Sequence, residues 1–108
     1  MEIPLEITFR GMGHSDAVEQ RIREKTAKLS RFQTPITSCR VLVDAPHHHH
    51  RKGNLFSVRI ELAVPGGEVV ASRDNNDHSH EDVYVTIRDA FAAAARQLEQ
   101  HIDRHRGG

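Results

Sequence analysis

Histidine is the residue type with the most suggestive chemistry in this sequence of 108 residues, which contains nine histidines. Four are consecutive, His47–His50, in the polar segment DAPHHHHRKGN, and His78 and His80 lie in a second polar segment, NNDHSH. Neutral imidazole is a good ligand for Zn, Ni and Cu. Because residues two apart face the same side of an extended segment, His47 with His49, or His78 with His80, are candidate pairs of metal ligands.

Two other interpretations of the tetra-histidine segment stay open. Structural zinc sites usually combine histidine with cysteine or carboxylate at a defined spacing, which this segment lacks. Its histidines would then contact only water, in a polar loop. Alternatively, Arg51 and Lys52, together with partly protonated histidines, contact phosphate groups or stack on bases.

A second suggestive group is a row of cations between residues 16 and 32. Apolar residues recur there at helical spacing, and at about 100° per residue Arg21, Lys25, Lys28 and Arg31 fall along one flank of the apolar stripe. Cations one turn apart suit a phosphate backbone, because charge and spacing matter there more than sequence. The alternative is an ordinary solvated helix flank.

Catalytic and membrane chemistry have little support in the sequence. The segment GMG lacks the third glycine and the Lys-Ser/Thr pair of a P-loop. The single cysteine, Cys39, falls on a predicted buried strand face, where a small inert thiol is expected. Fifteen basic residues balance fifteen acidic ones, and no apolar run is long enough to span a membrane. We therefore expect a non-enzymatic cytoplasmic protein without cofactor, small-molecule substrate or membrane contact.

Six elements must position these residues. Alternation of apolar and polar residues predicts strands over residues 3–9, 36–45, 55–64 and 68–74, and helical periodicity predicts helices over residues 16–32 and from Ser79 onward. The order β-α-β-β-β-α predicts an α+β fold, with one four-stranded mixed sheet and both helices packed on one face, a layout like that of double-stranded RNA-binding domains. Residues 1–106 form a single domain, and residues 107–108 are a tail or the start of a linker. We expect Arg59 and Arg73 on the open face of the sheet.

This topology places most of the histidines along one edge of the sheet. The loops that follow the first, second and fourth strands lie at the same end, because those strands run in the same direction. These loops contain seven of the nine histidines: His14, His47, His48, His49, His50, His78 and His80. Only His101 and His105, near the end of the last helix, fall at the opposite end.

The last helix also shows a pattern of a known family. The segment HEDVYVTIRDAF, followed by ARQLEQH, resembles the corresponding helix of the ribosome hibernation-promoting factor and ribosome-associated inhibitor family, also called sigma-54 modulation proteins. The segments KTAKLSRF and PGGEVVAS resemble the end of that family's first helix and its last hairpin. The resemblance extends over essentially the whole chain, in the same order.

The resemblance implies a β-α-β-β-β-α fold and a function. Members of this family bind the small ribosomal subunit and its ribosomal RNA in the mRNA channel of the decoding region, and they inhibit translation or promote ribosome hibernation under stress. By resemblance, Arg21, Lys25, Lys28 and Arg31 contact RNA from the first helix, and Arg88 and Arg96 contact it from the last. Arg51 and Lys52 are further candidates. The alternative is a histidine-rich, metal-responsive or protein-interaction domain on the same fold, without ribosome binding.

Overall fold

A computed structural model describes residues 3–32, 34–45, 56–74 and 83–106 of the chain. The strands are β1 (Leu5–Arg10), β2 (Ser38–Asp44), β3 (Ser57–Val64) and β4 (Gly67–Asp74). The helices are α1 (Asp16–Lys28), a short 3-10 helix η1 (Leu29–Arg31) that continues it, and α2 (Val83–Arg106). The predicted order β-α-β-β-β-α is therefore confirmed.

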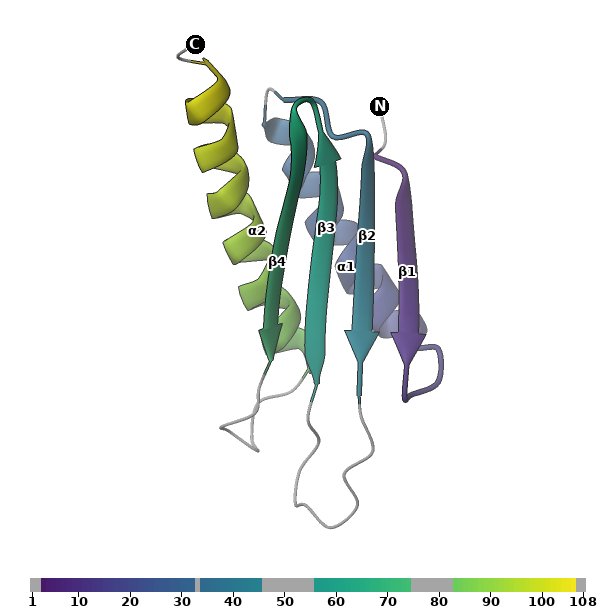
Figure 1. Cartoon of the computed structure of the whole chain (residues 1–108). Helices are drawn as coiled ribbons and strands as arrows, with labels where there is room; N and C mark the ends of the chain where they lie inside the picture. Colours follow the sequence, from purple (N-terminus) through teal and green to yellow (C-terminus); the bar gives the residue numbers. More distant parts are fainter. Residues whose placement is uncertain (1–2, 33, 46–55, 75–82, 107–108) are drawn as a thin grey trace.

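The four strands form one mixed sheet in the order β1-β2-β3-β4. β1 is parallel to β2, whereas β2 with β3 and β3 with β4 are antiparallel. Figure 1 shows α1 and α2 on the same face of the sheet, which leaves the other face open, as the sequence predicted. No helix in the described ranges is long and apolar enough to cross a membrane.

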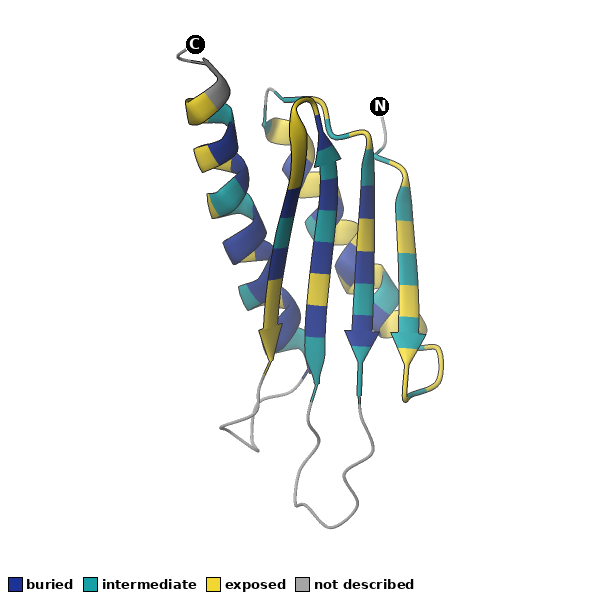
Figure 2. Cartoon of the chain, in the orientation of Figure 1, coloured by how far each residue is buried: buried dark blue, intermediate teal, exposed yellow. Residues whose placement is uncertain are grey.

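The core lies between the helices and the inner face of the sheet (Figure 2). Alternate residues of the two central strands point inward and are fully or almost fully buried, because a strand directs successive side chains to opposite faces. Ile22 of α1 and Ile87 and Leu98 of α2 have no exposed surface and close the core from the helix side. The apolar residues that recur at helical spacing in both helices therefore form their buried faces.

Local sequence signals explain how the elements begin and end. The Ser15 hydroxyl accepts a hydrogen bond from the backbone N–H of Val18 at 3.2 Å, so Ser15 caps α1. The α-helix ends at Lys28, earlier than the predicted residue 32, and the chain tightens into η1. Pro65 and Gly66 connect β3 to β4, and the positive φ of Gly66 (87°) is the conformation that a tight turn after proline requires.

The interior of the sheet also contains the one cysteine. Cys39 is 1% exposed, and burial raises the pKa of its thiol to about 11, an effect that the neighbouring Thr26 hydroxyl partly offsets. The thiolate is the reactive form of cysteine, so a buried thiol that resists ionisation is unreactive. The expectation that Cys39 is buried is confirmed, and its low reactivity stays a prediction.

We expect alkylation to report this burial directly. At pH 8 the native protein should react with iodoacetamide at least about 100-fold more slowly than the protein unfolded in urea, since raising the pKa from 9.0 to about 11 lowers the thiolate fraction by about that factor. Mass spectrometry of timed samples gives both rates. Equal rates in the two states would show that the Cys39 thiol is not buried.

Candidate nucleic-acid interface

The cationic row on α1 is present in the structure. Arg21, Lys25 and Lys28 are spaced four and three residues apart and so share one flank of the helix. Arg21 and Lys28 are exposed, whereas Lys25 is half-buried at the margin of the core. Arg31 follows in η1, where it is exposed and its guanidinium carbon lies 5.0 Å from the ring centroid of Phe32.

One contact shows that this flank faces α2. The guanidinium carbon of Arg21 lies 5.0 Å from the ring centroid of Tyr84, in a cation–π arrangement. Arg21 Nε is also 3.6 Å from a carboxylate oxygen of Glu24. These two contacts hold the guanidinium over the seam between the helices, so Arg21, Lys25 and Lys28 border that seam. Helical periodicity places Tyr84 beside the apolar stripe of α2, and it does not predict this pairing with a residue of α1.

The candidate residues of α2 divide between two directions. Arg88 lies one turn beyond Tyr84, near the seam, and its Nε is 3.2 Å from Oδ1 of Asp89. Arg96 is exposed, but eight residues after Arg88 it is rotated by about 80° around the helix. Helical spacing therefore places Arg88 on the flank of α2 that carries Tyr84, while Arg96 points further outward.

The opposite flank of α1 has a different electrostatic character. Arg23 donates two hydrogen bonds to one carboxylate oxygen of Glu19, at 2.9 Å from Nε and 2.7 Å from Nη2. This pair is neutral overall, so the cationic charge of α1 is concentrated on the flank that faces α2. We call Arg21, Lys25, Lys28 and Arg88 the seam cluster.

The open face of the sheet is acidic overall. Arg40 of β2 lies 3.6 Å from Glu6 on one side and 3.6 Å from Glu61 on the other. Arg59 Nε donates to Glu61 at 2.9 Å, which is the main reason why the pKa of Glu61 lies below its usual range. These residues line a shallow hollow of about 260 Å³.

The register of the strands gives the charge balance of this face. It carries three cations, Arg10, Arg40 and Arg59, against five acidic residues, Glu6, Asp44, Glu61, Glu68 and Asp74. Nucleic acid would be repelled here and attracted on the helix side. The predicted position of Arg59 is confirmed. Arg73 is not on this face, because it pairs with Val58 on the helix side of the sheet.

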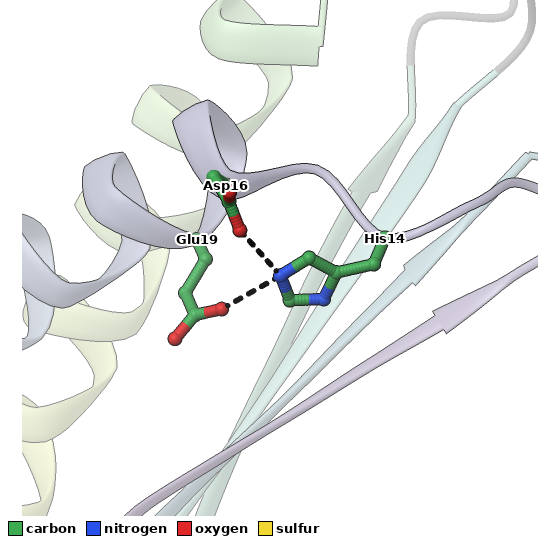
Figure 3. A group of neighbouring side chains, drawn as sticks. All are labelled: His14, Asp16 and Glu19. Atoms are coloured by element: carbon green, nitrogen blue, oxygen red, sulfur yellow. Dashed lines mark hydrogen bonds and ion pairs between the residues drawn. The ribbon is translucent and has the colours of Figure 1, made fainter.

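A small cluster of possible metal ligands lies where α1 begins (Figure 3). His14 Nε2 is 2.9 Å from Oδ1 of Asp16 and 3.0 Å from Oε1 of Glu19, and the His14 ring meets Phe9 edge-on at 5.1 Å. Among the described residues this is the one cluster of at least three such side chains. Carboxylates at the N-terminus of a helix are stabilised by the partial positive charge of the helix dipole there, and the same positive charge disfavours a bound cation. We therefore assign these side chains a structural role, which is to stabilise the N-terminus of α1.

Several of the predicted site residues lie outside the described part of the chain. These are the candidate RNA contacts Arg51 and Lys52 and the candidate metal ligands His47, His48, His49, His50, His78 and His80. Of the two histidines expected at the opposite end, His101 is 6% exposed and its Nε2 lies 3.0 Å from the carbonyl oxygen of Pro65. Its position at that end is confirmed, and its role is to pack against the β3–β4 turn.

Known proteins match this chain in sequence and in fold. The chain is 30% identical over 97 residues to ribosome-associated factor Y of Haemophilus influenzae, a match that covers 89% of this chain and 79% of that protein. The crystal structure of the N-terminal domain of protein Y from Thermus thermophilus superposes with a TM-score of 0.72 at 20% identity, covering 94% of this chain and 99% of that domain. A ribosomal subunit interface protein from Coxiella burnetii gives a TM-score of 0.65 at 17% identity, covering 98% and 100%. Residues 5–106 match the family model described as sigma 54 modulation protein / S30EA ribosomal protein, and the chain belongs to that family.

Proposed function

We propose that this protein is a ribosome-associated factor that binds ribosomal RNA of the small subunit with its helix side. The observation that carries the proposal is the concentration of cations along the α1–α2 seam, combined with an acidic sheet face. The family to which the chain belongs, and the ribosome-associated factor that it resembles at 30% identity, support a ribosomal partner.

The geometry of the seam cluster suits a phosphate backbone better than a single base. Successive cations on the α1 flank are three or four residues apart, so their Cβ atoms lie about 5–6 Å from one another. A row of positive charges at such short intervals suits a phosphate backbone. Both helices are anchored to the sheet by buried side chains, so the row is presented without a large loss of backbone entropy on binding. Tyr84 orients Arg21 and presents part of an aromatic ring beside the row.

The proposed consequence of binding is inhibition of translation. A folded domain seated in the mRNA channel of the decoding region competes with mRNA and tRNA for the same space, which silences the ribosome or promotes hibernation under stress. The activity is binding alone, without a catalytic residue, a cofactor or a small-molecule substrate. The protein acts where ribosomes are, in the cytoplasm.

Co-sedimentation with purified subunits over a salt series tests this proposal. We expect binding to the small subunit and not to the large one, with excess mRNA fragment competing for it. If Arg21, Lys25, Lys28, Arg31, Arg88 and Arg96 each neutralise one phosphate, affinity should fall about 1,000-fold between 50 and 200 mM salt. Absence of small-subunit binding at 50 mM salt, or equal binding to both subunits, would contradict the proposal.

A further inference from the structure

The strand β1 forms one edge of the sheet, and its inward-facing side chains are less buried than those of the two central strands. The inward-facing residues of β2 are all buried, whereas those of β1, namely Leu5, Ile7 and Phe9, pack against the core but are only partly buried (Figure 2). A free edge strand that carries apolar side chains can pair with a strand of another chain. This edge therefore has the hydrophobic character of an interaction surface.

The backbone of β1 is also available for pairing. The carbonyl oxygens of Pro4 and Arg10 accept hydrogen bonds from the backbone N–H groups of Cys39 and Ala45, each at 2.8 Å. The backbone N–H and C=O groups of the even-numbered residues along β1 therefore point toward β2. Alternate residues of a strand direct their N–H and C=O groups to opposite sides. The backbone groups of Leu5, Ile7 and Phe9 therefore point away from the sheet, and no described strand pairs with them.

The side chains on the open face of β1 are self-complementary. Glu6 and Arg10 lie symmetrically about Thr8, one acidic and one basic. We propose that β1 pairs antiparallel with β1 of a second copy of this chain, about a twofold axis at Thr8, to give an eight-stranded sheet. Each Glu6 then faces Arg10 of the other copy, and each Ile7 faces Phe9.

The charge register and the hydrogen-bond register of this pairing agree. In antiparallel pairs, two directly opposite residues exchange both backbone hydrogen bonds only if the groups of both point toward the partner. Ile7 opposite Phe9 meets this condition, because both are odd-numbered. Arg10 already contacts Asp44 at 2.9 Å, but its side chain is 65% exposed and its guanidinium has further N–H donors for a second carboxylate.

The other edge of the sheet lacks this complementarity. The open face of β4 carries Glu68 and Asp74 and no cation, so no antiparallel pairing of β4 with itself places opposite charges across from each other. The α1 flank on the β1 side carries the neutral Glu19–Arg23 pair, so the two α1 helices of the dimer do not repel strongly. The seam cluster stays exposed in the dimer, and self-association is independent of the proposed RNA binding.

Charge-reversal variants test this dimer. We expect sedimentation equilibrium of the wild-type protein without RNA to show a dimer whose fraction rises with protein concentration between about 10 and 500 µM. Weak association of this kind suits a small interface. Glu6→Arg alone and Arg10→Glu alone should each weaken dimerisation at least about tenfold, because like charges then face each other. An equimolar mixture of the two variants should form heterodimers, since one variant then presents only positive charges at these two positions and the other only negative charges.

The mixture separates the proposal from a folding defect, because mixing two misfolded variants would not restore assembly. The double variant Glu6→Arg/Arg10→Glu should likewise dimerise, with circular dichroism matching the wild type. A wild-type protein that stays monomeric up to about 0.5 mM would overturn the proposal. Single variants that dimerise as well as the wild type would overturn it too.

Discussion

Reversing three charges of the seam cluster, in the variant Arg21→Glu/Lys25→Glu/Lys28→Glu, is expected to abolish detectable binding to the small ribosomal subunit. Three attractions to phosphate become three repulsions, on a flank where Arg21 and Lys28 are exposed and Lys25 lies between them. We expect a loss of at least about 1,000-fold in affinity at 100 mM salt. Because each phosphate contact contributes about one counterion, the slope of log affinity against log salt should become shallower by about 2–3.

A pair of single variants provides a matched control for this result. Lys28→Glu and Arg23→Glu change the net charge equally, and both residues are exposed on α1, but only Lys28 lies on the flank facing α2. We expect Lys28→Glu to weaken binding about tenfold or more and Arg23→Glu to have a much smaller effect. Equal losses would show that overall charge, and not the seam cluster, controls binding. Thermal unfolding of each variant checks that α1 is intact.

A gentler substitution separates charge from orientation at Arg21. Arg21→Lys keeps the positive charge but replaces the planar guanidinium that lies over Tyr84. If Tyr84 serves to orient the cation, this variant should bind more weakly than the wild type while its salt dependence stays the same. Fluorescence titration with a labelled RNA fragment is sensitive enough to resolve the difference.

The buried face of a strand can be predicted only where apolar and polar residues alternate strictly along it. In β3, Val58, Ile60 and Leu62 are separated by polar or small residues, and all three are fully buried. In β4, Val69 and Val70 are adjacent and both apolar, so the pattern leaves two possible registers. The pairing with β3 decides between them: Val69 is buried, Val70 is on the open face, and Arg73 follows Val69 to the helix side.

The candidate site shows the same limit of sequence reasoning. The row of cations on α1 follows from helical periodicity alone, since residues three and four apart must share a flank. The contact of Arg21 with Tyr84 joins residues that are 63 positions apart, and it depends on how α1 and α2 lie side by side on the sheet. The burial of His101 has the same origin, because Pro65, which contacts it, lies 36 positions earlier.

Gly11 lies outside the hydrophobic core, yet its substitution is expected to lower the stability of the fold strongly. Gly11 has a φ of +75°, which side chains disfavour, and a Cβ at this position would lie 2.3 Å from the carbonyl oxygen of Ala45. That carbonyl cannot easily move, because the Ala45 N–H is bonded to the carbonyl oxygen of Arg10 at 2.8 Å. Gly11→Ala should therefore lower the free energy of unfolding by about 2–4 kcal/mol.

Gly13 supplies the control for this prediction within the same loop. A Cβ at Gly13 would meet no atom within 4 Å, so Gly13→Ala should change the free energy of unfolding by less than about 0.5 kcal/mol. Urea denaturation followed by circular dichroism measures both variants, and an effect of similar size in the two would contradict the proposed clash. Because the loop joins β1 to α1, a weakened Arg10–Ala45 contact should also loosen the β1 edge. Gly11→Ala is therefore expected to weaken self-association together with stability, whereas Gly13→Ala should leave both unchanged.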